Sequence, residues 1–319
     1  MGSKKKEKKE AGEKEHMSRQ YRVWIEHLTR CINDRMPLDD SYVLLHSANL
    51  IGLFTCVFVR HRERHRISNM RAAEVKRGMG GLYGNKGAIV LRFLFDDSSV
   101  CLVNCHLAAG QTHTAHRNND IAAILEAECL PIETSLTARA NHFVSGGDGS
   151  MIMDHEICIL NGDLNYRIDS IPRHIIIDAV RQNNLPKLLD RDQLLASRRK
   201  NPGFRLRSFT EAPITFAPTY KYDVGTDDYD SSDKKRSPAW CDRVLSRGRV
   251  QQMYYRRLDE VRSSDHRPVT AYFKLTVKTV SAPERAATWE SCLAEFQKER
   301  RRLTSEARFV FLHLLHLHC

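Results

Sequence analysis

The chain has 319 residues, of which 41% are hydrophobic, so it can form one large domain or two ordinary ones around a sizeable core. Its net charge of +11 favours an anionic partner, such as a nucleic acid, a phosphorylated metabolite or an anionic membrane surface. No apolar run has the length of a membrane span, and nine cysteines without a CxxC pair indicate a reducing compartment rather than a disulfide framework. We therefore expect a cytoplasmic protein.

The N-terminal part combines a polar leader with a helix and two strands. Residues 1–19 are nearly all charged or small, and we expect a disordered leader there. Residues 21–36 carry apolar side chains at helical spacing. Residues 42–60 predict two strands separated by a polar break at residues 46–49.

The middle of the chain predicts a hairpin followed by a helix. Residues 87–95 and 99–107 are apolar strands joined by the turn sequence Asp-Asp-Ser. Residues 117–130 have helical apolar spacing, and residues 142–154 form a glycine-rich loop.

The next strand covers the stretch EICILNGDLN at residues 156–165, and residues 172–200 have a helical pattern. Residues 220–238 form a long polar loop, and the last two strands lie at residues 242–248 and 267–277. This mixture of antiparallel strands and intervening helices predicts an α/β protein built as a sandwich of sheets faced by helices.

Polar side chains gather at the ends of four predicted strands. They are Asn104 and His106, Asp163 and Asn165, Asp242, and Asp265 with His266. An unpaired buried polar group costs about 1–3 kcal/mol, so a cluster of them normally pairs internally or holds a ligand. Each short motif alone is more often a turn, a cap or a core histidine. Their joint occurrence at strand ends predicts an acid–base site in which a carboxylate orients His266.

Six motifs carry a resemblance to a known family. They are GNKG (84–87), NCHLAAG (104–110), NGDLNYRI (161–168), PTYKYD (218–223), KKRSPAWCDRVL (234–245) and SSDHRPV (263–269). Together they resemble the inositol polyphosphate 5-phosphatases, a branch of the superfamily that includes deoxyribonuclease I. GDLN and SDH alone would indicate only the superfamily, whereas PAWCDR followed by SDHRPV is specific for the phosphatase branch.

The resemblance implies a four-layer α/β/β/α sandwich and Mg²⁺-dependent hydrolysis of the 5-phosphate of phosphoinositides or inositol polyphosphates. It implies that Asp163 is the general base and that Asn165 positions the water and the phosphate. His106 and His266 would stabilise the phosphoryl group, and Asp242 would fix the tautomer of His266. A phosphoryl transition state needs mainly positioning and charge neutralisation, which such a set supplies.

The resemblance also implies roles for residues around this set. Tyr220, Lys221 and Lys234 would bind the 4-phosphate of the inositol ring. Further substrate contacts would come from Asn85, Lys86 and Arg236. Asp265 would be an outer metal-site or orienting residue. From composition alone, the lysines of the 220–238 loop would be a solvated charged surface.

One part of the family pattern is absent from the sequence. The family has an early strand that ends in Gln-Glu, and this Glu is the main Mg²⁺ ligand. No acid before residue 68 ends an apolar strand in that context. We therefore expect an N-terminally incomplete catalytic domain over residues 20–280, followed by a C-terminal helix and tail over residues 281–319.

The missing Glu leaves the activity of this chain open. We expect it to be weakly active or inactive, although its lineage is enzymatic. The alternatives are a non-catalytic phosphoinositide-binding remnant and a nuclease of the same superfamily. The lysine-rich 4-phosphate motif argues against the nuclease, so no nucleic acid partner is expected. An anionic membrane surface is an expected partner, with the protein peripheral to it. The sequence does not indicate which oligomeric state the protein has.

Overall fold

The computed structural model describes residues 2–316; Met1 and residues 317–319, which belong to the predicted leader and tail, lie outside the described residues. The chain divides into two compact units, Met1–Val277 and Lys278–Cys319.

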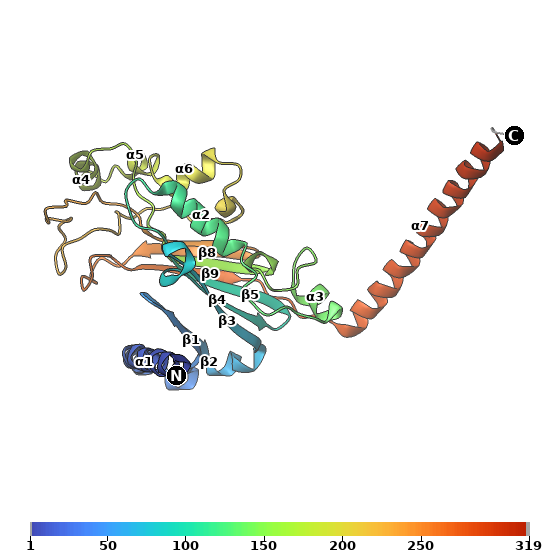
Figure 1. The fold of residues 1–319 in the computed structure, drawn as a ribbon, viewed down its shortest axis with the longest axis horizontal. Helices are drawn as coiled ribbons and strands as arrows, with labels where there is room; N and C mark the ends of the chain where they lie inside the picture. The colour runs from blue at the N-terminus through green and yellow to red at the C-terminus, as the bar shows by residue number, and fades with distance from the viewer. Residues whose placement is uncertain (1, 317–319) are drawn as a thin grey trace. The chain divides into compact units, whose positions relative to one another are not determined.

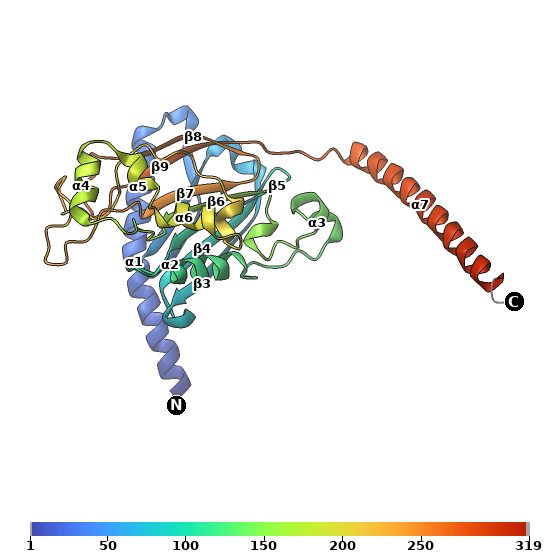
Figure 2. The same cartoon turned by 90° about the horizontal axis from the view of Figure 1, so that it is seen from above.

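The first unit is organised around a five-stranded sheet (Figures 1 and 2). Its strands, in spatial order, are β3 (Ile67–Gly78), β4 (Tyr83–Phe95), β5 (Ser98–His106), β6 (Ile157–Asp163) and β7 (Asp242–Arg247). Only the β5–β6 pair is parallel, and the other neighbours are antiparallel. The predicted hairpin between β4 and β5 is present.

Both faces of this sheet are buried. Along β4, Ala88 and Val90 belong to one hydrophobic cluster, whereas Ile89 and Leu91 belong to another. Successive strand residues point to opposite faces, so the alternation places apolar side chains on both sides of the sheet. The sheet is therefore an inner layer.

Helices cover the first face of the sheet, as Figure 1 shows. Ile121 of α2 (Thr114–Leu125) and Leu194 of α6 (Gln193–Lys200) pack with Val103 of the sheet in a fully buried cluster. The remaining helices on the chain between the strands are α3 (Leu136–His142), α4 (Arg173–Arg181) and α5 (Leu185–Leu189). Short 3-10 helices occupy Leu38–Asp40, His61–Arg66, Met79–Gly81, Ile152–Asp154 and Arg205–Ser208.

The second face of the sheet is covered by two separate strand pairs. The first pair is β1 (Tyr42–Leu50) with β2 (Leu53–Arg60), and the second is β8 (Val250–Arg257) with β9 (Val269–Leu275). Leu53 of β2 packs on the face of the central sheet. The two pairs form the second β layer.

Helix α1 (Gly2–Arg35) forms the fourth layer. Tyr21 stacks on Phe54 of β2 with ring centroids 5.3 Å apart, and its hydroxyl donates a hydrogen bond of 3.1 Å to the Leu50 carbonyl. The predicted α/β/β/α sandwich is thereby confirmed, with a second β layer made of two pairs of strands.

The leader differs from the prediction. We expected disorder over residues 1–19, but α1 runs without a break from Gly2 to Arg35. The leader is rich in Lys and Glu and contains Ala11, and these residue types have high helix propensity. Opposite charges four residues apart add further support to a helix. Low hydrophobicity therefore did not prevent helix formation here.

One strand boundary differs from the prediction, and two strands were not predicted. The expected break at residues 46–49 lies inside β1, and the chain turns instead at Gly52, whose φ of +76° favours glycine. Strands β3 and β8 were not predicted. The sequence of β3 has few large apolar residues, and that of β8 places Val250, Met253 and two tyrosines among Gln and Arg without a regular alternation. Residues of this kind suit strands with one solvated face.

The second unit consists of a long helix, α7 (Ala282–His316). Among the described residues, no helix combines the length and the apolarity that crossing a bilayer requires.

Candidate active site

Three adjacent strands bring the predicted catalytic residues to one edge of the central sheet. In the strand register, His106 of β5 is opposite Asp163 of β6, and Asp163 is opposite Asp242 of β7. Gly162 permits this alignment, since a Cβ atom there would meet the Cys105 carbonyl oxygen at 2.1 Å. The glycine of the NGDLN motif thus lets β5 and β6 approach closely just before the acid.

Asp163 is held by the residues that follow it. Asn165, in the left-handed region with φ of +56°, donates to Asp163 Oδ1 from its backbone N at 3.0 Å and to Oδ2 from Nδ2 at 3.0 Å. His106 Nε2 lies 3.3 Å from Oδ2. Burial opposes the charged carboxylate, but the contact with His106 and the nearby cations outweigh it, so the pKa of Asp163 is lowered. Asp163 is therefore ionised at neutral pH.

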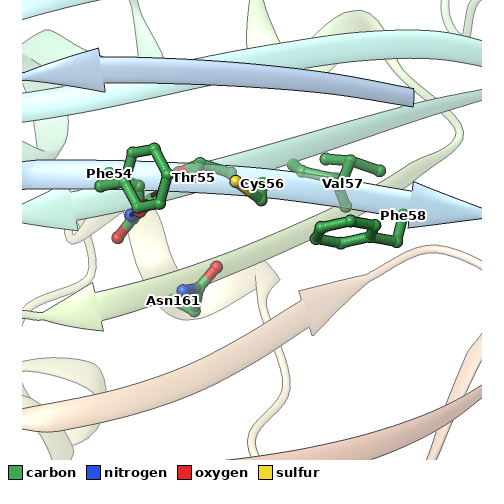
Figure 3. Close-up of a pocket in the computed structure, with 8 residues that line it drawn as sticks. Phe54, Thr55, Cys56, Val57, Phe58 and Asn161 are labelled. Carbon is green, nitrogen blue, oxygen red and sulfur yellow. Dashed lines mark hydrogen bonds between the residues drawn. The ribbon is translucent and has the colours of Figure 1, made fainter. Parts of the chain in front are cut away.

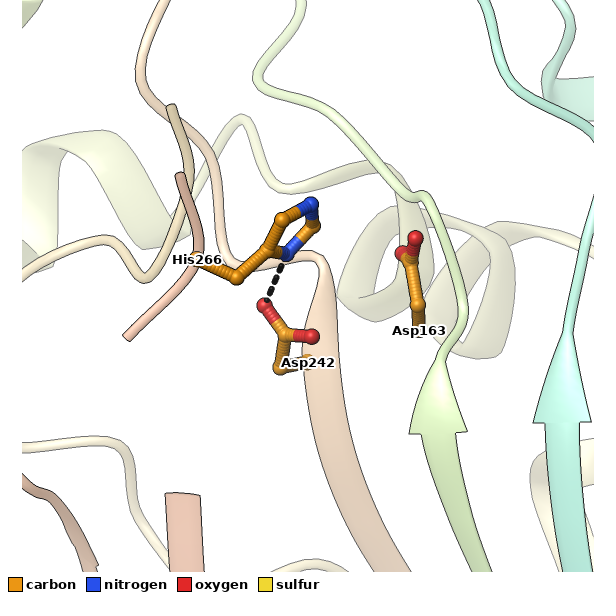
Figure 4. A group of neighbouring side chains, drawn as sticks. All are labelled: Asp163, Asp242 and His266. Atoms are coloured by element: carbon orange, nitrogen blue, oxygen red, sulfur yellow. Dashed lines mark hydrogen bonds and ion pairs between the residues drawn. The ribbon is translucent and has the colours of Figure 1, made fainter. Parts of the chain in front are cut away.

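His266 and Asp242 form the predicted pair (Figure 4). His266 Nδ1 lies 2.8 Å from Asp242 Oδ2, which also accepts a 2.6 Å hydrogen bond from the Thr219 hydroxyl. Burial of His266 disfavours its charged form, but the hydrogen bond and the charge of Asp242 are stronger, so the pKa of His266 is raised. Asp242 thus engages Nδ1, and Nε2 is the ring nitrogen on the side away from Asp242.

Lys86 reaches the same edge from β4. Its Nζ contacts His106 Nε2. That nitrogen accepts from Lys86 when it is unprotonated and donates to Asp163 when it is protonated, so His106 links the Lys86 side chain to the Asp163 carboxylate. Burial of Lys86 lowers its pKa, although Asp163 opposes this effect. Asn85, the neighbouring predicted substrate contact, is exposed on β4.

Tyr220 and Lys221 lie beside His266. The rings of Tyr220 and His266 have centroids 4.8 Å apart. Lys221 Nζ, predicted to bind phosphate, forms a 2.7 Å ion pair with Asp265 Oδ2. Burial opposes ionisation of Asp265, but the hydrogen bond from Lys221 dominates and its pKa is lowered. Asp265, predicted as a metal-site residue, thus pairs with a lysine.

A basic cavity of about 470 Å³ adjoins this cluster. Its lining includes Tyr220, Lys234 and Arg236, all predicted as substrate contacts. Arg167 also lines it, with its guanidinium 4.3 Å from the Tyr220 ring centroid. Sequence reasoning missed Arg167, although it stands two residues after Asn165 and donates to the Asn165 side chain. The remaining lining residues are Ala109, Gly110, Gln111, Lys235 and Ser237.

Two further cavities lie on the second face of the sheet, and both include Asn161 of β6. One, of about 430 Å³, is lined by residues 54–58 of β2, as Figure 3 shows. The other, of about 330 Å³, is lined by Asp163 and Asp242 together with residues of β9. The acids of the cluster are therefore also reached from this second face.

Asp163, Asp242 and His266 form a group that could hold a cation. One ligand atom from each lies within 4.8 Å of the others. Mg²⁺ is commonly bound by one or two carboxylates together with waters and substrate phosphates, so the two acids fit a divalent cation in kind. Three of their four oxygens already accept the hydrogen bonds described above. Among the described residues, this group contains no glutamate.

The Asp242–His266 pair predicts a specific pH effect. Asp242→Asn removes the negative charge that raises the pKa of His266, so the alkaline limb of kcat/KM is expected to move to lower pH. The sign follows because charged His266 is lost as pH rises through its folded-state pKa. Measuring kcat/KM against pH checks this. Thr219→Val keeps the charge of Asp242 and should leave the limb in place; an equal shift in both variants would contradict the assignment.

Comparison with known proteins agrees with this geometry. Residues 3–272 match the Endonuclease/Exonuclease/phosphatase family 2, and the chain belongs to that family. Human synaptojanin-1 is 35% identical over 86% of this chain and 18% of its own length. A Schizosaccharomyces pombe protein named as a probable inositol polyphosphate 5-phosphatase is 51% identical over 86% of this chain and 23% of its own length.

A solved structure is also similar to this chain. The inositol polyphosphate 5-phosphatase domain of SPsynaptojanin, in complex with inositol (1,4)-bisphosphate and a calcium ion, has a TM-score of 0.73 and 32% identity. The match covers 89% of this chain and 77% of that one. Within the family, the chain is therefore a member of the inositol polyphosphate 5-phosphatase branch. It spans less than a quarter of the length of the two curated relatives.

Proposed function

We propose that this chain hydrolyses the 5-phosphate of inositol polyphosphates or phosphoinositides. The observation that carries the proposal is the meeting of His106, Asp163, Asp242 and His266 at one sheet edge, beside a cavity lined by cations. A phosphorylated ring in that cavity would place one phosphate at the acid–base cluster and another among the cations. The membership in the 5-phosphatase branch supports the same reaction class.

In the proposed mechanism, water attacks the phosphorus while Asp163 accepts its proton, and the bond from phosphorus to the ring 5-oxygen breaks. The departing oxygen takes up a proton from solvent and becomes a hydroxyl group of the inositol ring. The lowered pKa of Asp163 keeps it ionised, and Asn165 holds the carboxylate in place. Charged His266 donates from Nε2 to a non-bridging phosphate oxygen, since Nδ1 is bound to Asp242. His106, backed by Lys86, contacts the same phosphoryl group. Positioning and charge neutralisation are the main requirements of phosphoryl transfer.

We propose Mg²⁺ as the cofactor, held by the carboxylates of Asp163 and Asp242. When bound, it would polarise the phosphate and neutralise charge that develops on its oxygens. Asp265 is a weaker candidate, because Lys221 already pairs with it.

We also propose that turnover by this chain is slow. Three of the four carboxylate oxygens accept hydrogen bonds, so a bound cation would have to share them with those donors. The second cavity reaches Asp163 and Asp242 as well, and water at these acids weakens electrostatic stabilisation. A non-catalytic phosphoinositide-binding role is the second candidate, and the same engaged oxygens favour it. Binding to phosphoinositide vesicles, which would place the protein at a membrane surface, without phosphate release would support that role.

Phosphate release measured beside nicking of supercoiled plasmid tests the reaction class. Release from a soluble inositol trisphosphate with Mg²⁺ and no nicking supports the proposal. Nicking without phosphate release would assign the chain to the nucleases of the family instead.

Lys234 provides a test of substrate binding. Lys234→Met is expected to raise KM for inositol 1,4,5-trisphosphate about tenfold, because a charge-assisted hydrogen bond contributes about 1.5–3 kcal/mol and each 1.4 kcal/mol is a factor of ten. Steady-state kinetics with and without a 4-phosphate on the substrate check this. Lys274→Met, which changes an exposed lysine of β9, is the matched control. Equal losses for both substrates would remove Lys234 from the 4-phosphate site.

A further inference from the structure

Helix α7 carries a row of large apolar side chains on its surface. The row consists of Trp289, Phe296, Leu303 and Val310, which are exposed by 68%, 63%, 53% and 56%. Each follows the previous one by seven residues. Because seven residues are close to two helical turns, all four lie on nearly the same side of the helix.

A second row runs beside the first and completes a heptad pattern. It consists of Ala286, Leu293, Arg300, Ala307 and Leu314. The two rows alternate at spacings of three and four residues, as positions a (second row) and d (first row) of a coiled coil do. Eight of these nine positions are apolar, and the pattern lasts for about four heptads, the length at which it predicts a coiled coil.

The opposite side of α7 is polar over most of its length. Ser291, Lys298 and Ser305 occupy the heptad position farthest from the seam. Phe309, Phe311 and Leu315 are exposed apolar residues off the seam, and all three lie near the end of the helix. A single helix of this kind leaves its apolar seam in water, whereas pairing two seams buries it.

We propose that α7 binds α7 of a second copy of this chain as a parallel, in-register, two-stranded coiled coil. Charge complementarity supports a second copy of the chain as the partner of α7. In a parallel pair, position g of one helix lies beside position e of the next heptad on the other, which places Arg285 beside Glu290 of the second copy. The three following g–e pairs each contain at most one charged residue, so none is repulsive. They are Cys292 with Gln297, Glu299 with Thr304, and Glu306 with Phe311.

Arg300 fixes the register and the number of strands. It is the one charged residue among the nine seam positions. In register, the two Arg300 side chains share one layer and extend along the seam to water, as long basic side chains do. A shifted or antiparallel pairing would place each Arg300 against an apolar layer. A single polar a residue specifies register and oligomer state at a cost in stability.

Sedimentation equilibrium of the full chain tests the pairing. The wild-type chain is expected to be a dimer, and Leu303→Glu at the seam is expected to be a monomer. Phe309→Glu places the same charge on an exposed apolar residue off the seam and should stay dimeric. Arg300→Leu is expected to lower the dimer dissociation constant by about tenfold or more, because it buries apolar surface at the seam. Tighter dimerisation of Arg300→Leu cannot result from loss of folding, so it would show that the seam itself forms the interface.

Disulfide trapping tests the direction of the helices. In a Cys292→Ser background, Leu293→Cys at the seam should crosslink two copies under mild oxidation, whereas Ser291→Cys on the polar side should not. A monomeric wild-type chain, or a dimer that Leu293→Cys cannot crosslink, would overturn the proposal. Monomeric binding to anionic vesicles that Phe309→Glu and Leu303→Glu weaken equally would also overturn it and assign the apolar side of α7 to a lipid surface.

Discussion

Asp163→Asn is expected to lower kcat for phosphate release by about 10²–10⁴-fold, the range for loss of a general base. The amide keeps the shape of the carboxylate and one oxygen that can accept a hydrogen bond from Asn165, but it loses the second acceptor and cannot take a proton from water. KM should change little, because the cations of the adjacent cavity remain. Single-turnover assays with labelled inositol trisphosphate can measure the loss even if the wild-type chain is slow.

A control measurement must show that this variant still folds. Asp163 is half-buried at the end of β6, so the variant should keep the thermal transition of the wild-type chain within a few degrees. Asp178→Asn, on the exposed surface of α4, changes an acid to its amide away from the cluster and should leave kcat unaltered. Turnover equal to wild type in Asp163→Asn would remove Asp163 from the mechanism.

Arg243→Met is expected to destabilise the first unit by about 3–5 kcal/mol, the cost of breaking a buried ion pair by removing one partner. Arg243 is fully buried on β7 beside Asp242 and bonds to Asp192 at 3.0 Å and Glu211 at 2.7 Å. Burial already raises the pKa of Asp192 in the intact protein. Without Arg243, both acids lose their cation, and the start of β7 loses its bond to α6.

The pH dependence of this variant follows from the raised pKa of Asp192. An acid whose folded-state pKa exceeds its unfolded-state value destabilises the fold as pH rises, so the loss of stability should be smallest at acid pH and should grow toward neutral pH. Denaturant titrations followed by the buried Trp240 measure it. Asp192→Asn and Glu211→Gln added to Arg243→Met should restore much of the stability. A pH-independent loss would show that packing, rather than charge, is the cause.

The meeting of the candidate active-site side chains at one sheet edge could be predicted because each of them stands at a strand end in the sequence. Asp163 and Asn165 follow an apolar run, and the register then places His106 and Asp242 beside them. The partner of Lys221 could not be predicted in this way. Its ion pair with Asp265 joins residues 44 positions apart, and either residue would serve equally well as a phosphate or metal contact on pattern alone.

The parts of the fold that escaped prediction share a physical cause. Strand β3 has mostly exposed or half-buried side chains, so its sequence lacks the apolar alternation of β4. In helix α1 the low hydrophobicity of the sequence predicted disorder, but the high helix propensity of its residues favours the observed helix. Patterns of burial predict the core strands well and the solvated elements poorly.

Identifying which phosphate leaves the ring is the most direct test of the central claim. Phosphorus NMR of inositol 1,4,5-trisphosphate incubated with this chain and Mg²⁺ resolves loss of the 5-phosphate from loss of the others. We predict slow formation of inositol (1,4)-bisphosphate, abolished by Asp163→Asn. Release of the 1- or 4-phosphate, or 5-phosphate release that persists in Asp163→Asn, would contradict the account.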